Sequence, residues 1–298
     1  MRTFLFLTLS AYGWSQNMTV PTVGSIYNPA SAGIHAMPGL SGAASLSDVL
    51  VPSLRAASVS ADGDAAIVAK DDGTFLVSGI STGSTHFQLI SSALTFRTAW
   101  ANGSAIVYAE GSWFKVSLGA GAWMLSPLSP GLPDGSVNAL DYDAANSRFY
   151  VSVDGQGVFS VSVNEGTLTL LAPLASAKYL AHNVNQVFAT TDDSIFTVKS
   201  GTASLFANLA SKVVGIAAST DSKRLYVASA NQVTIYSSAG VPGDPLPVQA
   251  NKLERLNYSS LLLSNESGQP VWILNDSDVP FAFFVPAWKR ATVQGARQ

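Results

Sequence analysis

VVGIAASTDSKRLYVASANQVTIYSS, residues 213–238, contains three short runs in which apolar and polar side chains alternate. The first run ends at a polar turn at residues 219–222, the second covers residues 223–229, and the third follows a turn at residues 230–232. Alternation with a period of two residues is typical of β-strands, and Asp, Asn and Ser are typical of the turns between them. The stretch therefore predicts three strands that follow one another as a meander.

Similar units recur along the chain at a nearly constant spacing. The predicted innermost strands of these units begin at Arg55, Arg97, Asn138, Lys178, Val214 and Glu254, with spacings of 42, 41, 40, 36 and 40 residues. A period of about 40 residues with three or four strands per unit is typical of a β-propeller, in which small sheets form blades around a central channel. The sequence therefore predicts an all-β propeller of six to seven blades within residues 16–288.

The segment before these repeats, residues 22–53, is rich in Gly, Ala, Ser and Pro and contains two short apolar runs, at residues 24–27 and 33–37. We expect these runs to form an N-terminal β-hairpin that closes the ring, because an open sheet edge would expose unpaired backbone groups. Two arrangements fit the sequence. Either the hairpin adds a strand to the last of six blades, or it belongs to an incomplete seventh blade.

Three repeats share a motif at the start of their second strand. Residues 221–228 read DSKRLYVA, residues 143–152 read DAANSRFYVS, and residues 60–69 read SADGDAAIVA. The motif resembles the repeat core of the bacterial YVTN-type, lactonase-like β-propellers, commonly written D-G-K-R-L-Y-V-A, with Ser222 in place of glycine. The resemblance implies the architecture but says little about chemistry, because propellers with this core include enzymes, scaffolds and binding modules. None of the family's active-site motifs matches, so its catalytic residues are not carried over.

Composition and charge narrow the possible functions. The 298 residues have 12% charged side chains and a net charge of -3, which gives no electrostatic basis for binding nucleic acid. The chain has no cysteine, so it has neither a disulfide framework nor a thiolate nucleophile or metal ligand. We therefore expect the chain to form one large all-β domain, to be a monomer and to have no transmembrane segment.

The first fifteen residues resemble a secretory signal peptide. Arg2 gives a positive start, residues 4–9 (FLFLTL) are apolar, and Gly13 and Ser15 are small residues at the positions that precede a cleavage site. We therefore predict a signal peptide at residues 1–15 and a secreted or periplasmic protein, the alternative being a partly buried N-terminal strand. Residues 289–298 are predicted to be a flexible polar tail.

The first candidate ligand-binding residues lie where the innermost strands begin. In propellers the loop that enters this strand lies at the face where ligands meet the central channel. Arg55, Arg97 and Lys178 would hold an anionic group there by charge-assisted hydrogen bonds. The alternative is that these long side chains lie across the rim with their charged ends in water.

Three further candidates belong to the same channel mouth. Trp100 lies on an innermost strand beside Arg97, although packing between blades would also explain it. His182 lies on another innermost strand and has a side chain suited to proton transfer, with a structural role as the alternative. Convergence of Arg97, Asp141 and His182 at the channel mouth would favour an enzyme, whereas an apolar plug would argue against one.

A ring of acidic residues is predicted in the turns between the second and third strands, on the same face. Grouped carboxylates bind hard cations such as calcium, but Asp and Asn also occur in tight hairpins for their turn geometry alone. Their spacing around the ring keeps most of them too far apart to share one ion. We therefore predict no metal and no cofactor. The acidic residues of these turns are Asp71, Asp72, Glu110, Asp154, Asp192, Asp193 and Glu266.

Two classes of function remain. The favoured one is an exported non-catalytic propeller that binds a partner protein, glycan or surface polymer through its loop-rich face. The alternative is a lactonase-like or other small-molecule hydrolase with a site at the channel mouth. The sequence contains no H-E-x-x-H or G-x-S-x-G motif, and the predicted innermost strands offer mainly Ala, Leu, Ile and Ser, so the first class is favoured.

Overall fold

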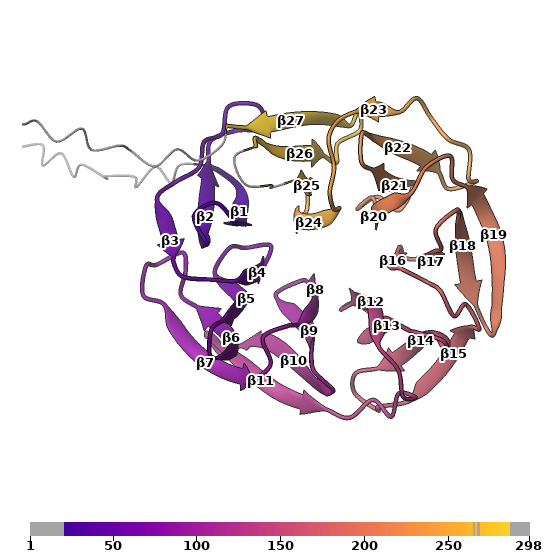
Figure 1. Ribbon diagram of the computed structural model, residues 1–298, viewed down its shortest axis with the longest axis horizontal. Coiled ribbons are helices and arrows are strands. Elements are labelled where there is room, and N and C mark those ends of the chain that lie inside the picture. The colour runs from indigo at the N-terminus through magenta and orange to yellow at the C-terminus, as the bar shows by residue number, and fades with distance from the viewer. Residues whose placement is uncertain (1–20, 265, 267–268, 287–298) are drawn as a thin grey trace, which may run out of the picture.

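The computed structural model describes residues 21–264, 266 and 269–286, and the predicted signal peptide and tail lie outside them. The regular elements of the described part are β-strands, in six four-stranded sheets and one three-stranded sheet. Figure 1 shows these sheets as seven blades in a ring. The predicted all-β propeller is confirmed. In the described part of the chain no helix is long and apolar enough to span a membrane.

The strands of each blade follow one another from the centre of the ring to its circumference. Blade 1 contains β1 (Thr22–Asn28), β2 (Gly33–Pro38) and β3 (Val49–Val51). Blade 2 contains β4 (Ala56–Val59), β5 (Ala65–Lys70), β6 (Gly73–Ser78) and β7 (His86–Ser91). Blade 3 contains β8 (Arg97–Ala101), β9 (Ser104–Ala109), β10 (Ser112–Gly119) and β11 (Ala122–Leu128). Blade 4 contains β12 (Val137–Asp143), β13 (Arg148–Val153), β14 (Gly157–Ser162) and β15 (Leu168–Ala172).

The remaining three blades repeat this order. Blade 5 contains β16 (Tyr179–His182), β17 (Val187–Thr190), β18 (Ser194–Lys199) and β19 (Thr202–Asn208). Blade 6 contains β20 (Val213–Ala218), β21 (Arg224–Ser229), β22 (Gln232–Ser237) and β23 (Leu246–Pro247). Blade 7 contains β24 (Glu254–Asn257), β25 (Ser260–Ser264), β26 (Val271–Asn275) and β27 (Phe281–Val285). The stretch at residues 213–238 thus supplies three strands of blade 6.

The second strand of each full blade explains why the repeats share an apolar middle. β5 and β25 are buried along almost their whole length, and β21 is buried from Leu225 onward. A strand covered on both faces by neighbouring blades needs apolar side chains in both directions, so it reads as a continuous apolar run. The outer strands are more exposed, as β7 and β19 show.

The hydrophobic core is a ring of seven clusters, and each cluster lies between two neighbouring blades. Between blades 5 and 6, for example, Phe188 packs with Ile216 and Leu225. Between blades 7 and 1, Met37 packs with Phe283. Each blade therefore depends on both of its neighbours for burial of its two faces.

The N-terminal segment forms a blade of its own. β1 pairs with β2, and β3 completes the sheet through two residue pairs with β2. β1 lies between the innermost strands β24 and β4, and the side-chain amide of Asn257 donates a hydrogen bond to the carbonyl of Val23. Of the two arrangements compatible with the sequence, the structure has the incomplete seventh blade. The short strand Val49–Val51 was not predicted.

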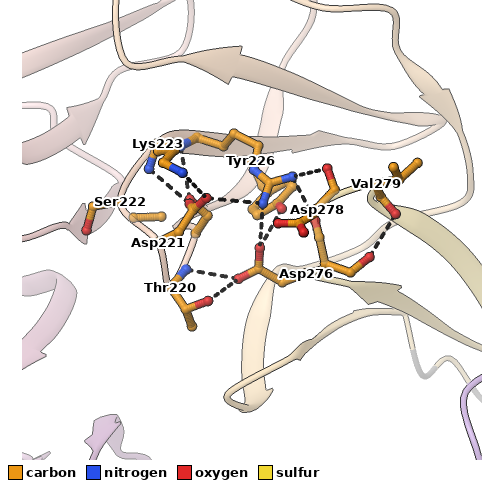
Figure 2. A network of polar contacts seen from close by, with 12 residues as sticks. Thr220, Asp221, Ser222, Lys223, Tyr226, Asp276, Asp278 and Val279 are labelled. Carbon is orange, nitrogen blue, oxygen red and sulfur yellow. Dashed lines mark hydrogen bonds and ion pairs between the residues drawn. The ribbon is translucent and has the colours of Figure 1, made fainter.

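A buried carboxylate connects blade 6 to blade 7 (Figure 2). Asp276 follows β26, and its side chain is 1% exposed. It accepts hydrogen bonds from the Tyr226 hydroxyl at 2.6 Å, the Thr220 backbone N–H at 3.0 Å and the Arg255 guanidinium at 3.0 Å. A second guanidinium, that of Arg224, lies 3.8 Å away. Both carboxylate oxygens are thus satisfied, as a buried charge requires.

The surroundings of Asp276 determine its protonation state. Burial acts to raise the pKa of Asp276, but the hydrogen bonds from Tyr226, Thr220 and Arg255 outweigh it, so the pKa lies below its ordinary value of 3.8. Burial and the same carboxylate raise the pKa of the Tyr226 hydroxyl. Asp276 is therefore ionised at neutral pH and Tyr226 remains its hydrogen-bond donor.

Candidate functional site

A central cavity of about 1770 Å³ runs between the innermost strands. Every innermost strand is paired on one side only, so the wall of the cavity consists of seven sheet edges. A sheet edge presents unpaired backbone N–H and C=O groups as well as side chains. All seven blades contribute to the lining, with Tyr27, Ser58, Trp100, Asp141, His182, Ile216 and Arg255 among the residues.

The innermost strands all begin at one face of the ring and end at the other. We call these the start face and the end face. At the start face, Arg55 pairs with Asp71 at 2.6 Å, and Lys178 pairs with Asp192 at 2.5 Å. Each of these acids lies in the turn between the second and third strands of the same blade. The acidic turns therefore open on the face where the innermost strands begin.

These pairs change the interpretation of the three cations. Arg55 and Lys178 are each neutralised by an acid of their own blade, and Arg55 does not line the cavity. The hydrogen bond from Lys178 lowers the pKa of Asp192. Arg55, Arg97 and Lys178 thus do not converge on one anion-binding site.

Arg97 differs from these two cations. It is the first residue of β8, its side chain is exposed, and it lines the cavity. It makes no ion pair or side-chain hydrogen bond within the described part of the chain. Among the described residues that line the cavity, it is the cation without an acidic partner.

His182 and Asp141 form a pair at the end face. The Nδ1 atom of His182 lies 2.7 Å from a carboxylate oxygen of Asp141, and the ring of Tyr150 lies 5.5 Å from the imidazole. Burial lowers the pKa of His182, but the charge and hydrogen bond of Asp141 outweigh burial, so the pKa is raised above its ordinary 6.5. Burial also raises the pKa of Tyr150 to about 12.

The His182 titration can be measured by NMR. In the wild type the pKa of His182 should lie above 6.5, and Asp141→Asn should lower it, because the attraction and hydrogen bond of Asp141 are lost while burial remains. Since the folded-state pKa is the higher one, the pair stabilises the fold fully below pH 6.5 and loses this effect as the pH rises through the folded pKa. The His86 signals are the control. An unchanged His182 pKa in Asp141→Asn would contradict the assignment.

Asp141 and His182 meet, but Arg97 does not converge with them. Arg97 is the first residue of its innermost strand, and His182 is the last residue of β16. Lys178 at the start face and His182 at the end face are four residues apart, which at about 3.3 Å per residue corresponds to about 13 Å. The residues line one cavity at two different levels, so they do not form one catalytic cluster.

Trp100 lies between blades 2 and 3 and also reaches the cavity. Its ring packs edge-on against the ring of Trp123, with the two ring centroids 5.8 Å apart. The indole N–H of Trp123 donates a hydrogen bond to the side chain of Asp64 in blade 2 at 3.4 Å. The Trp100 Nε1 atom is buried and has no hydrogen-bond partner in the described residues. This placement supports the alternative interpretation that Trp100 packs between blades.

One contact at the end face was not anticipated. Tyr258, in the turn between β24 and β25, donates a hydrogen bond to the side chain of Asn102, in the turn between β8 and β9, at 3.0 Å. These turns belong to blades 7 and 3, which are separated by blades 1 and 2 around the ring (Figure 1). The contact therefore crosses the end-face mouth of the cavity. No local sequence signal distinguishes Tyr258 from an ordinary exposed turn residue.

The acidic turns do not gather into a metal site. Within residues 21–264, 266 and 269–286, no group of three or more His, Asp or Glu side chains lies close enough to hold a metal ion. Asp71 and Asp192 pair with cations instead, and Asp154 accepts a hydrogen bond from Asn138 at 3.2 Å.

Comparison with solved structures agrees with the fold. No protein-family model and no curated protein matches the sequence. PorZ of Porphyromonas gingivalis, a surface component of the type-IX secretion system, superposes with a TM-score of 0.62 at 11% identity over 90% of this chain. This chain spans only 38% of the PorZ chain.

Two further structures are similar. Apo AztD of Citrobacter koseri gives a TM-score of 0.59 at 11% identity, covering 88% of this chain and 94% of AztD. YCF48 bound to D1 peptide gives a TM-score of 0.54 at 12% identity, covering 78% and 81%. The fold and the comparisons define the class of this protein as a seven-bladed β-propeller.

Proposed function

We propose that the chain is an exported, non-catalytic β-propeller that holds a segment of a partner protein in its central cavity. The observation that carries this proposal is the wall of the cavity, in which seven sheet edges face a volume of about 1770 Å³. Extended peptides bind proteins by pairing their own backbone with an exposed sheet edge, while side chains supply specificity. A protein segment can satisfy such backbone groups along its length, which favours it over a glycan or surface polymer.

The comparisons and the sequence support separate parts of the proposal. The similar YCF48 structure contains a bound peptide, and PorZ is a component of a bacterial surface. Export rests on the signal-like pattern at residues 1–15, and membership of the YVTN-type family rests on the motifs at residues 221–228 and 143–152.

A peptide library selection on the purified protein tests the proposal. Because the chain has no cysteine, Lys178→Cys places a single bulky maleimide label at the start face, and Leu205→Cys places the same label on the outer strand β19. We expect enriched peptides to lose at least tenfold in affinity when Lys178→Cys is labelled and to bind the labelled Leu205→Cys protein normally. Equal effects of the two labels, or no enriched peptide, would contradict binding in the cavity.

A small-molecule hydrolase is the second candidate, and the His182–Asp141 pair is the observation that favours it. Asp141 holds Nδ1, so Nε2 is the atom left to exchange a proton with a substrate or water. Hydrolysis of lactone and ester panels by the wild type, abolished in His182→Ala, would establish this function. Activity that survives in His182→Ala would be assigned to a contaminant.

A further inference from the structure

We infer that the start-face mouth of the cavity recognises a carboxylate of the bound segment, and that Arg97 is the residue that binds it. The inference rests on the proposed function and names the chemistry of its ligand. Several blades carry a cation near the start of their innermost strand. Blade 3 differs from the others in whether this cation has an acidic partner and faces the cavity.

In blades 2, 5 and 7 the cation is already paired with an acid, and in blade 6 Lys212, which precedes β20, does not line the cavity. Arg55 pairs with Asp71, Lys178 pairs with Asp192, and Lys252 pairs with Glu254 at 3.2 Å. In the described part of blade 3, neither Arg97 nor the acid of the corresponding turn, Glu110, makes an ion pair.

The turn of blade 3 also differs in its backbone from the turn of blade 2. Glu110 and Gly111 form a two-residue turn between β9 and β10, with left-handed φ values of 44° and 87°. Such a turn is typical of tight hairpins. Asp71, the acid that pairs with Arg55, has no such left-handed backbone. Arg97 presents an uncompensated guanidinium to the cavity, and the planar guanidinium binds a carboxylate through two parallel hydrogen bonds.

A second charge at the mouth favours a single carboxylate over a polyanion. Asp154 of blade 4 is exposed and lines the same cavity, and its hydrogen-bond partner Asn138 is neutral. Asp154 therefore keeps its negative charge next to the blade that carries Arg97. A polyanionic chain would meet repulsion at Asp154, whereas one carboxylate on an otherwise neutral or basic peptide would not.

The contact between Tyr258 and Asn102 indicates the direction of entry. Because it crosses the end-face mouth, a segment enters the cavity from the start face and passes Arg97 first. The carboxylate is then either an Asp or Glu side chain of the entering segment or its C-terminal group. Both sources have the same chemistry, and peptide variants distinguish them.

The test uses peptides that the labelled Lys178→Cys protein fails to bind, with affinities measured by fluorescence polarisation. Arg97→Ala should weaken binding about tenfold or more, because hydrogen bonds between charged groups are the strong ones. Arg55→Ala is the control, since Arg55 lies one position before Ala56, the residue of blade 2 that corresponds to Arg97 in the strand register, and it lies outside the cavity, so it should leave the affinity unchanged. Replacing the acidic side chains of the peptide by amides, or amidating its C-terminus, should reproduce the loss for one source and not the other. Both protein variants should melt at the wild-type temperature.

Three results would overturn the inference. The first is that Arg97→Ala binds the peptide with the same affinity as Arg55→Ala, while the label at Lys178→Cys still blocks binding. In that case the proposed function stands, but Arg97 does not bind the carboxylate. Peptides that retain their affinity without any carboxylate lead to the same conclusion. If a polyanion such as heparin displaces the peptide in an Arg97-dependent manner, the ligand class is wrong. If no peptide binds in the cavity, the proposed function fails together with the inference.

Discussion

Asp276→Ala should lower the free energy of unfolding by about 3–5 kcal/mol, because it leaves buried donors and a guanidinium without their partner. Tyr226, Thr220 and Arg255 all donate to this one carboxylate, and its side chain is 1% exposed. At roughly 2–4 °C per kcal/mol for a large domain, the melting temperature should fall by about 6–20 °C. Differential scanning calorimetry measures the change.

Asp71→Ala is the matched control for this prediction. It removes another aspartate of an ion pair, but the Asp71 side chain is 88% exposed, so the expected change is at most about 1 kcal/mol. Similar small effects of the two substitutions would show that the network in Figure 2 does not hold blades 6 and 7 together.

The same network predicts a dependence on pH. The pKa of Asp276 is lower in the folded state than its ordinary value of 3.8, so its contribution to stability is present above that value and is lost as the pH falls through the folded pKa. The difference in melting temperature between wild type and Asp276→Asn should be constant from about pH 5 to 7 and should shrink below about pH 4. A difference that grows on acidification would contradict the low pKa.

Deletion of residues 22–40 should cause aggregation or a large loss of stability. The deletion removes β1 and β2, which cover the cluster that contains Leu256, Leu262 and Phe283 of blade 7. Each large apolar side chain returned to water costs about 1.5–3 kcal/mol, and an open sheet edge is a template for further strands. Light scattering and thermal melting measure the outcome.

Deletion of residues 290–298 controls for the effect of truncation itself. These residues lie outside the described part of the chain, and their polar sequence predicts an unchanged melting temperature. If the protein without residues 22–40 melts at the same temperature as the full-length chain, blade 1 is dispensable and six blades close the ring alone.

The strands could be predicted because their signal is local. The alternating and continuous apolar runs of β20 to β22 and of blade 7 follow from burial on one or two faces of each strand. The strand Val49–Val51 carries too little signal, since it has three residues and pairs with β2 at two positions after a Gly- and Ser-rich stretch. The number of blades depended on how the N-terminal hairpin pairs, which the sequence does not show, so six and seven both stayed open until β1 was located between β24 and β4.

The sequence predicted where the candidate site residues lie in their blades, but it did not predict which side chains they contact. Repeat alignment places Arg55, Arg97 and Lys178 at the start of their blades, yet it does not show that two of them are neutralised by acids of their own turns. The partners of Asp276 lie up to 56 residues away in the sequence, and the turn that contains it resembles any polar turn. Distances between residues on different blades are set by ring closure, which no local pattern encodes.

Hydrogen–deuterium exchange of the protein with and without a saturating selected peptide tests binding in the central cavity most directly. Because the innermost strands have unpaired edges toward the cavity, the peptide should slow exchange in β8, β12 and β16 and leave the outer strands β7, β15 and β19 unchanged. Protection confined to the outer strands, with exchange of β8, β12 and β16 unaltered, would contradict it.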